Sequence, residues 1–520
     1  MNHLPLITTL TFLPLLGGVL LVGLRPAGEG AARRWALGIS LVTLALAGWA
    51  WHRFDLTQAQ FQFVERHPWI PSLNVEYFLG VDGVSLLMLL LTGVVTPMAI
   101  LASRGIRTAA SLYFALVLFL EAGLLGTFTA LNFFHWFIFW ELSLVPAFFL
   151  IKLWGGPRSG PAATQFFIYT MVGSVALLLA FLAIYMTTGR FDFVTLAQMG
   201  RDNRLEAFFQ VRLGWYNLFP TKESLALAIF GLAFLGFAVK VPALPFHTWL
   251  PATYAEAPTG VTMLLTGVMS KMGVYGVVRI LVPIFPEQMR AALTPLLWVA
   301  VATIVLSAAA AFVQRDLKRM LAYSSVNHLG YCLLGLFAVL KFTGADPQAA
   351  GEKAAALNGV FLQMFNHGLT AATLFAFLGV LEERSGGLRG IADFGGLRQV
   401  APVFCGLMGI AVFASLGLPG LNGFVGEFLI FKGAFSLATW ATALATLGLL
   451  GTAIFLLTLV QKVFHGPLNA RWARFADLTA PERLMVLPAT VLMFVLGLYP
   501  RLLLDVTNRT VAHLVEQLKF

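Results

Sequence analysis

The sequence predicts an all-α polytopic membrane protein with about 14 transmembrane helices. Hydrophobic residues make up 59% of the 520 positions and charged residues 11%, whereas soluble domains average roughly 45–50% and 25%. Apolar windows of about 20 residues, the length that crosses roughly 30 Å of hydrocarbon, follow one another along the chain. Two windows are interrupted by proline or glycine, so we expect two of the helices to be broken.

The apolar windows give the expected order of the spans. The first span lacks a basic segment and a small-residue cleavage site, so we expect it to be retained rather than removed as a signal peptide. The expected spans are 4–24, 34–51, 79–101, 110–130, 132–152, 163–187, 224–255 (broken), 260–282, 293–313, 319–340, 357–381, 401–436 (broken), 438–463 and 484–503. An amphipathic tail over 504–520 is expected to lie along the membrane surface or a neighbouring element.

The two broken spans, 7 and 12, indicate an internal repeat. Span 7 reads FAVKVPALPF over 237–246, and span 12 reads ASLGLPGLNGFVGEF over 414–428. Paired interruptions are typical of transporter halves, and units with five crossings each are inverted relative to one another. The expected units are three N-terminal helices (1–109), a first five-helix repeat (110–282), a second repeat (293–463) and a C-terminal helix with its tail (484–520). A kinked packing helix is the alternative interpretation of either break.

Composition and charge narrow the functional classes. The net charge of +10 would suggest nucleic-acid binding in a soluble chain, but in a membrane protein Lys and Arg gather in cytoplasmic loops. The loops after odd-numbered spans hold most of them, so that side is expected to be cytoplasmic or its stromal equivalent. Only Cys332 and Cys405 occur, in separate spans, which excludes a disulfide framework and cysteine-held zinc or iron–sulfur sites. No nucleotide-binding or hydrolase motif has its required context.

Two lysines lie inside apolar segments. Lys240 and Lys271 flank the stretch VPALPFHTWLPATYAEAPTGVTMLLTGVMS, in which Pro242, Pro245 and Pro251 follow Lys240. Because an ammonium group near the hydrocarbon centre is costly, each lysine is expected to face a partner or water inside the protein. The prolines break the helix near Lys240. A lysine that snorkels from a helix end to the membrane surface is the alternative interpretation of Lys240.

Carboxylates and imidazoles occupy other spans. Glu141 lies about ten residues from either end of span 5, roughly 15 Å from each membrane surface, and we expect it to be the charge that lies deepest in the bilayer. Glu427 follows the second break, and His328 and His367 lie near the middles of spans 10 and 11, where imidazole can pass protons on. The alternatives are a permanently paired carboxylate and hydrogen-bonded core histidines. Weaker candidates near span ends or breaks are Asp82, His135, His247 and Lys432.

Together these residues place one protonatable group in each of six spans: Glu141, Lys240, Lys271, His328, His367 and Glu427. The motifs that carry them are FWELSLVPAFFLIKLWGG, KVPALPFHTWLP, EAPTGVTMLLTGVMSKMGVYG, LAYSSVNHLG, FNHGL and LPGLNGFVGEF. They resemble the antiporter-like membrane subunits of complex I, in the M-type branch (NuoM or NdhD), and are most similar to the cyanobacterial and plastid form. The resemblance covers nearly the whole chain. It implies fourteen helices, breaks in spans 7 and 12, and a proton path through the bilayer midplane.

The resemblance also implies a function. The chain would be a proton-translocating, non-redox subunit of a photosynthetic or respiratory NAD(P)H or ferredoxin:quinone oxidoreductase, in a cyanobacterial thylakoid or bacterial plasma membrane. It would hold no cofactor, with quinone and iron–sulfur clusters in partner subunits. Its partners would be other membrane subunits, including further antiporter-like ones, and lipids, but no nucleic acid. The alternative is an Mrp-type cation/proton antiporter subunit, which shares the same core.

One motif departs from the family pattern. The family often reads Leu-Pro-Asp-Ala-His-x-Glu-Ala after the first break, whereas this chain has Ala252 and Tyr254 in place of the acid and the histidine. The departure puts in doubt the usual proton path near Glu256, and it is compatible with a specialised paralogue such as those of cyanobacterial CO2 uptake.

The order of the six groups predicts their roles. Glu141 and Lys240 are expected to form a switchable pair, because each is costly alone. Lys271 is expected to be the central group, from which the path continues through His328 and His367 to Glu427. We expect water to bridge the gaps along this path.

Overall fold

The computed structural model describes residues 5–26, 28, 30–202, 204–205, 221–341 and 347–518. The predicted start of span 1 at residue 4, much of the connection 188–222 and the end of the tail at 519–520 lie outside them. Within the described ranges, 13 helices are long and apolar enough to cross a membrane. Two shorter helices, α17 (Pro402–Ser415) and α18 (Asn422–Leu437), form the predicted broken span 12. The prediction of an all-α membrane fold is confirmed, while the boundaries of the four units stay predictions.

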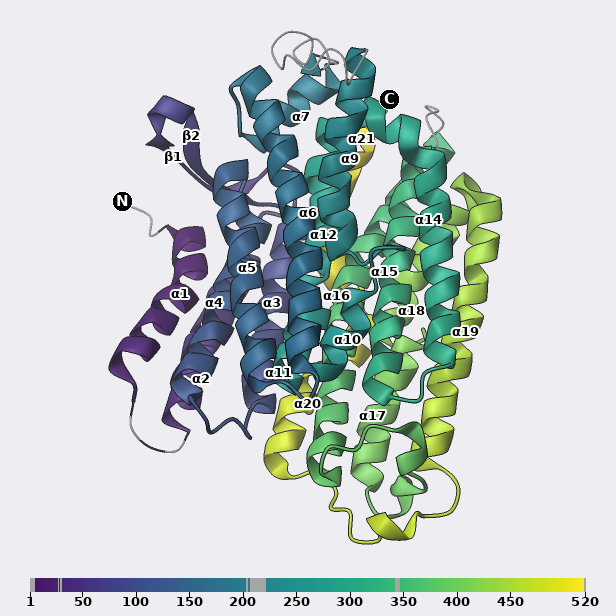
Figure 1. Cartoon of the computed structure of the whole chain (residues 1–520). Helices are drawn as coiled ribbons and strands as arrows, with labels where there is room; N and C mark the ends of the chain where they lie inside the picture. The colour runs from purple at the N-terminus through teal and green to yellow at the C-terminus, as the bar shows by residue number, and fades with distance from the viewer. Residues whose placement is uncertain are drawn as a thin grey trace.

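The N-terminal unit has three spanning helices and a β-hairpin. The helices are α1 (Leu6–Leu24), α2 (Ala31–Arg53) and α3 (Gly83–Ala102). The sequence analysis assigned no element to the antiparallel strands β1 (Gln62–Ile70) and β2 (Val75–Val81). Glu65 on β1 accepts hydrogen bonds from the backbone N–H groups of Ile7 (2.8 Å) and Thr8 (3.2 Å). A carboxylate at this position satisfies free N–H groups of a helix N-terminus, so the hairpin holds the start of α1 (Figure 1).

The next helices lead to the first break. They are α4 (Ala110–Thr129), α5 (Phe133–Trp154), α6 (Ser159–Thr188), the short α7 (Phe193–Arg201), α9 (Lys222–Lys240) and α10 (Trp249–Glu256). The break falls between α9 and α10, as the prolines predict. Its backbone groups find partners inside the protein: the Trp249 indole donates to the Val239 carbonyl (3.0 Å), and the Leu244 N–H donates to Thr303 Oγ1 (3.0 Å). These bonds make an interrupted helix tolerable at membrane depth.

Span 8 is continuous but irregular. It consists of α11 (Thr259–Leu264), α12 (Lys271–Gly276) and α13 (Val282–Ile284), joined by the π-helical turns η2 (Leu265–Met269) and η3 (Val277–Leu281). Every residue of its most apolar window is buried. Wider π-helical turns shift the side chains that follow them and are frequent at functional sites. Lys271 is the second residue after one such turn and the first of α12.

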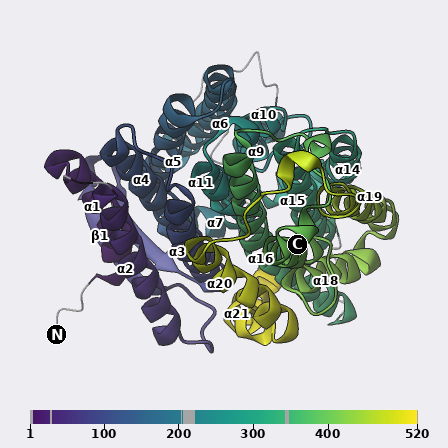
Figure 2. The same ribbon diagram turned by 90° about the horizontal axis from the view of Figure 1, so that it is seen from below.

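The second half of the chain packs beside the first (Figures 1 and 2). Its helices are α14 (Pro286–Phe312), α15 (Leu317–Lys341), α16 (Pro347–Ser385), the broken pair α17 and α18, and α19 (Thr439–Phe464). At the second break Gly417 and Gly420 have φ of 72° and 94°, a conformation that side-chain-bearing residues rarely adopt. The glycines of LPGLNG therefore allow the predicted break.

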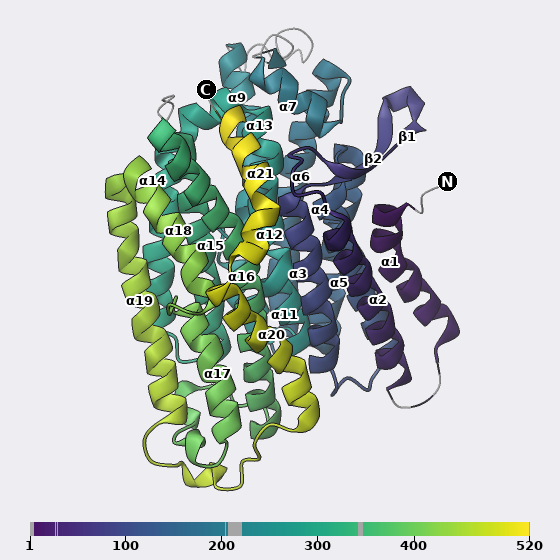
Figure 3. The same ribbon diagram turned by 180° about the vertical axis from the view of Figure 1, so that it is seen from behind.

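The chain ends in α20 (Ala480–Leu498) and α21 (Arg501–Gln517). Figure 3 shows α21 in front, lying across α16 and beside α3. The Gly83 N–H donates to Thr510 Oγ1 (3.1 Å), and Asn358 Nδ2 donates to Asn508 Oδ1 (3.0 Å). The amphipathic tail thus lies on neighbouring elements, one of the two expected positions, and connects the N-terminal unit to the second half.

Candidate functional site

Four of the six predicted side chains form one buried row at the centre of the molecule. Lys271 Nζ lies 2.9 Å from His367 Nδ1, and His328 Nδ1 lies 3.2 Å from Glu427 Oε1. The two imidazole ring centroids are 5.0 Å apart. Lys271 is fully buried, and the other three residues are at most 6% exposed. The row joins span 8 to α16, α15 and α18.

The π-helical turn before Lys271 supplies its other contacts. Lys271 Nζ donates to the Thr266 carbonyl at 2.5 Å and lies 3.4 Å from Ser270 Oγ. In this turn the Ser270 N–H bonds to the Leu265 carbonyl (3.1 Å) rather than to Thr266. The π-helical register therefore leaves the Thr266 carbonyl free to accept from the ammonium group.

The far end of the row is held at the second helix break. His328 Nε2 lies 3.1 Å from Ser415 Oγ, the last residue of α17. Gln363 Nε2 lies 3.3 Å from His328 Nδ1 and 3.3 Å from Glu427 Oε1. The break brings a hydroxyl, an amide and a carboxylate to one imidazole. Its two nitrogens can therefore accept a proton on one side and donate one on the other.

The expected order of the row is wrong, because His367 rather than His328 lies next to Lys271, and His328 rather than His367 lies next to Glu427. The expectation that water bridges the gaps is wrong for these two contacts. Lys271 contacts His367 directly, and His328 contacts Glu427 directly. The reason is close helix packing. A Cβ atom at Gly368 on α16 would lie 2.5 Å from the Gly267 carbonyl oxygen in span 8, so glycine at this position lets the helices that carry His367 and Lys271 approach each other.

The first-half residues are arranged differently from the prediction. Lys240 is 3% exposed, and its Nζ lies 4.8 Å from the centre of the Trp140 ring, a cation–π contact. Glu141 is near enough to Lys240 for an electrostatic interaction, but the ion pairs found among the described residues do not include these two. The structure therefore brings Lys240 to Trp140, with Glu141 at a greater distance.

Glu141, which we expect to lie deepest in the bilayer, does not face the interior of the protein. It is only partly buried, and it shares a face of α5 with Ile138 and Val145, which are 44% and 43% exposed. Lys271 and Glu121 are both fully buried. Distance from the helix ends gives depth in the membrane, but the rotation of the helix decides whether a side chain faces the interior.

Two further polar residues near the row were given no role from the sequence. Gln363 and Ser415 bond the His328–Glu427 end, and neither residue type stands out in an apolar span, so only contacts reveal them. The weaker candidates have partners elsewhere: Asp82 pairs with Arg279, Lys432 with Glu352, His135 packs on the Tyr77 ring and His247 on the Tyr323 ring.

Glu121 was also missed. It lies mid-way along α4 in LFLEAGLL, is fully buried and interacts with Thr96 on α3. The signal was present in the sequence, since a lone acid inside a predicted span is the feature that singled out Glu141.

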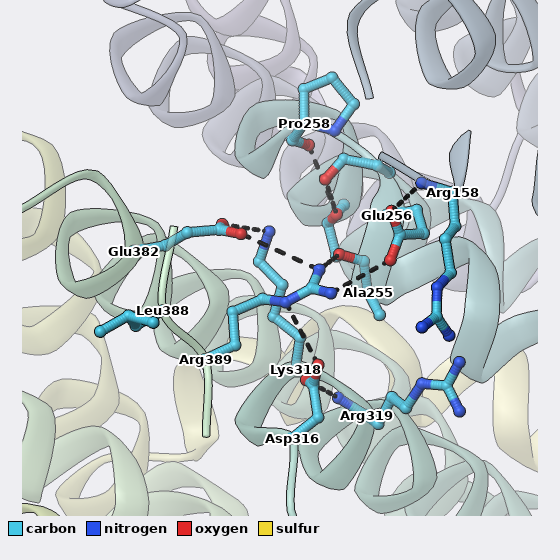
Figure 4. A network of polar contacts seen from close by, with 12 residues as sticks. Arg158, Ala255, Glu256, Pro258, Asp316, Lys318, Arg319, Glu382, Leu388 and Arg389 are labelled. Carbon is cyan, nitrogen blue, oxygen red and sulfur yellow. Dashed lines mark hydrogen bonds and ion pairs between the residues drawn. The ribbon is translucent and has the colours of Figure 1, made fainter. Parts of the chain in front are cut away.

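A second polar network lies where α10 ends and α15 begins (Figure 4). Glu256 is 4% exposed, accepts from Arg389 Nη2 (3.1 Å) and from the backbone N–H of Arg158 (2.9 Å). Arg389 Nε also lies 3.2 Å from Asp316, and Lys318 Nζ lies 2.5 Å from Glu382. Burial opposes the Arg389 charge, but the carboxylates of Asp316 and Glu256 raise the pKa of this guanidinium above its usual value. The network ties Glu256 into fixed contacts.

Tyr254 replaces the histidine of the family pattern. It is fully buried, and its ring lies edge-on to Phe375 with centroids 5.8 Å apart. Its hydroxyl lies beside Thr266 and Ser270, the residues that contact Lys271. At this position the chain therefore has a neutral hydroxyl instead of an imidazole.

Comparisons with known proteins agree with this architecture. The family model described as NADH:quinone oxidoreductase/Mrp antiporter, TM, matches residues 130–454. NADH-quinone oxidoreductase subunit M of Rhodobacter capsulatus is 36% identical, over 98% of this chain and 96% of that protein. NAD(P)H-quinone oxidoreductase chain 4 1 of Synechococcus elongatus is 35% identical, over 100% and 93%. The similarity to the bacterial and the cyanobacterial form is thus nearly equal.

Solved structures share the fold over the whole chain. A chain of respiratory complex I from Thermus thermophilus with bound NADH matches with a TM-score of 0.83 and 27% identity, over 98% of this chain and 99% of that one. A chain of the Mrp complex from Dietzia matches with a TM-score of 0.81 at 21% identity, over 100% of both, which shows the fold alone. By its matched family model and its full-length relatives, the chain belongs to the NADH:quinone oxidoreductase/Mrp antiporter family of multi-pass membrane proteins, in which it is most similar to the M-type subunits of complex I.

Proposed function

We propose that this chain is a proton-translocating membrane subunit of a complex I-like oxidoreductase, and that protons move along Lys271, His367, His328 and Glu427. The observation that carries the proposal is the buried row itself, in which an ammonium group, two imidazoles and a carboxylate follow one another at contact distances. Buried ionisable groups in a membrane are costly, so a continuous row of them is expected where protons pass.

The chemistry follows from what each group can hold. The Lys271 ammonium donates toward His367 Nδ1, and when the proton crosses this bond the lysine is left neutral and the imidazole charged. The proton then passes to the second imidazole and from His328 Nδ1 to the Glu427 carboxylate. Each transfer moves one proton between groups of the chain and needs no cofactor of its own. Gln363, bonded to both His328 and Glu427, holds the last pair in register.

We assign to Lys240 and Glu141, in the first half of the chain, the role of coupling a charge change to the Lys271–Glu427 row. The Lys240 ammonium group lies over the Trp140 ring, and the Glu141 carboxylate is nearby. The ammonium group can therefore interact with either the aromatic ring or the carboxylate. A change in the charge of Glu141 alters the electrostatic field at Lys240 and, through the first break, at span 8. This arrangement supports the proposed switch between Glu141 and Lys240 without a permanent ion pair.

The full-length relatives favour an oxidoreductase over an antiporter. Proteins similar to this chain over 93% or more of their own length are named as quinone oxidoreductase subunits, whereas the Mrp structure shares the fold alone. The partners are then other membrane subunits, including further antiporter-like ones, in a bacterial or cyanobacterial membrane. Quinone and iron–sulfur clusters are assigned to partner subunits, and no group of three or more His, Cys, Asp or Glu side chains fit for a metal ion is found among the described residues.

The test is purification of the native assembly in mild detergent, followed by reconstitution in proteoliposomes. Copurification of peripheral iron–sulfur subunits, together with quinone-dependent proton uptake that Glu427→Gln removes, is the expected result. Copurification of small membrane subunits only, with sodium-dependent proton movement, would establish the Mrp-type alternative instead.

A further inference from the structure

A row of hydroxyl side chains lies on one face of α3, away from the Lys271–Glu427 row. Ser85, Thr92, Thr96 and Ser103 are separated by seven, four and seven residues. At 3.6 residues per turn they fall within about 40° of one another around the helix. All four are at most 5% exposed. A polar stripe along the whole of a spanning helix is therefore buried inside the protein rather than turned to lipid.

Glu121 faces the middle of this row. It lies on α4, interacts with Thr96 and is fully buried. Apart from Thr96, neither carboxyl oxygen has a hydrogen-bond partner among the described residues, and the ion pairs found in the described part of the chain do not include Glu121. Because an isolated carboxylate in an apolar interior is very costly, the group is held in its neutral, proton-bearing form.

One end of the row reaches the face that carries the β-hairpin. Ser85 Oγ lies 2.9 Å from Tyr275 Oη, which also donates to the Phe128 carbonyl (3.0 Å). The first residue before α3 is Asp82, paired with Arg279. Asp82 and Arg279 line a cavity of about 390 Å³, and its wall includes Val64, which is 50% exposed. The hydroxyl row therefore ends beside a cavity that reaches the protein surface and that Asp82 and Arg279 line together with mainly apolar side chains.

The other end reaches the opposite face. Ser103 Oγ lies 2.9 Å from Tyr113 Oη. Both line a cavity of about 200 Å³, together with Arg104, Glu382 and the exposed Glu383. Figure 2 shows α3 next to α4 and α11, the helices that form this seam. Polar groups thus lie at both ends of the seam and at its middle.

We propose that Glu121 is a proton-binding site on a second polar path, which runs along the seam of α3, α4 and span 8 and is separate from the Lys271–Glu427 row. At 1.5 Å per residue the hydroxyls of the row are about 6 to 10 Å apart along the axis, so water completes the path between them when protons move. Net transport along this path rests on the proposed function, whereas proton exchange at Glu121 does not.

The hydrogen bonds of the hydroxyl row do not explain why an acid, Glu121, lies beside it. Thr92 donates to the Met88 carbonyl (2.7 Å), Thr96 to the Thr92 carbonyl (2.8 Å) and Ser103 to the Ala99 carbonyl (2.8 Å). Such bonds within a helix satisfy the hydroxyl protons and leave the oxygen lone pairs turned toward the seam. A purely structural stripe of this kind has no need of an acid, and apart from Thr96 Glu121 has no ion-pair or hydrogen-bond partner among the described residues to give it a structural role.

Infrared spectroscopy of the intact complex in lipid tests the site. A protonated carboxyl group has a carbonyl band distinct from that of a carboxylate, and we expect Glu121→Gln to remove one such component and that component to shift after transfer to D2O. Thr96→Val should slow the shift. Thr127→Val is the control, because the Thr127 hydroxyl is fully buried on α4 and donates to the Gly123 carbonyl. This substitution should leave the rate of the D2O shift unchanged. No loss of a component in Glu121→Gln, or a component that does not exchange in D2O, overturns the proposal.

A second measurement tests transport along the path. In proteoliposomes, Glu121→Gln and Thr96→Val should lower the number of protons moved per electron while quinone reduction continues, and Glu121→Asp should restore part of the loss. Unchanged proton numbers in both variants overturn the second path. If the unaltered complex moves no protons, the proposed function of the subunit fails, while the D2O result on Glu121 is unaffected. Thr96→Val keeps the test usable if Glu121→Gln does not assemble.

Discussion

Lys271 and His367 are joined by a 2.9 Å contact between Nζ and Nδ1 in the centre of the protein. The partner of this buried ammonium group is thus an imidazole and a backbone carbonyl, not a carboxylate. A carboxylate would hold the proton on the lysine, whereas a neutral imidazole competes for it. The pairing is suited to a group that releases its proton.

The first prediction concerns this release. Arginine effectively never loses its proton, so Lys271→Arg keeps the charge but blocks the transfer to His367. We expect proton uptake by the reconstituted complex to fall by about 10²-fold or more, the usual contribution of a proton-transfer group. Normal uptake in an assembled Lys271→Arg complex would show that Lys271 acts only as a fixed charge.

The second prediction concerns the acceptor at the other end of the row. Glu427→Gln retains the shape of the side chain and a hydrogen-bonding amide beside Gln363 but removes the proton-accepting carboxylate. Proton uptake should be lost while the complex assembles. Lys432→Gln on the same helix is the control, because Lys432 pairs with Glu352 at the surface. Equal effects of the two substitutions would contradict a specific role of Glu427.

The third prediction distinguishes two effects of substitution at the second break: strain of the backbone and steric contact with Glu427. Gly417 and Gly420 both have positive φ, so alanine at either costs about 1–2 kcal/mol of stability. A Cβ atom at Gly417 would lie 2.6 Å from Glu427 Oε2, whereas a Cβ atom at Gly420 would have no other heavy atom within 4 Å. Thermal unfolding of the complex should be affected by both substitutions, but proton uptake mainly by Gly417→Ala. A similar loss of uptake in Gly420→Ala would mean that strain alone is responsible.

The fourth prediction concerns the first half. Glu141→Ala should nearly abolish proton uptake and leave assembly detectable, because the field at Lys240 loses its carboxylate. Trp140→Phe keeps an aromatic ring under the ammonium group and should have a smaller effect, since cation–π contacts contribute about 0.5–2 kcal/mol. Full uptake in the Glu141→Ala complex would remove Glu141 from the proposed switch.

The fifth prediction concerns the network around Arg389. Glu256 is buried whereas Arg389 is 22% exposed, so Arg389→Ala removes one charged hydrogen-bond partner from a buried carboxylate and should destabilise the protein by about 1–3 kcal/mol. The expected sign is a lower unfolding temperature and less assembled complex. Arg398→Ala, at an exposed position close by in the chain, should be nearly neutral. Equal stability of the two variants would show that the Glu256 network contributes little.

The sequence by itself determined the number and order of the spans, both helix breaks and the positions of the ionisable groups along them. These follow from one-dimensional properties: the apolar length that crosses a bilayer, the missing N–H of proline and the permitted φ of glycine. Lys240, Lys271, His328, His367 and Glu427 stand out because each interrupts an apolar segment. The fold class and the family could be predicted on these grounds.

Only the tertiary structure decided which of these groups meet and which face they occupy. Glu141 and Glu121 are both single acids near the middle of a span, yet one lies partly exposed and the other is fully buried. His367 contacts Lys271 where Gly368 on α16 approaches Gly267 in span 8, and His328 on α15 contacts Glu427 on α18. Helix rotation and the distance between helices are set by packing of side chains that are far apart in the sequence, which is why spacing along one helix could not give them.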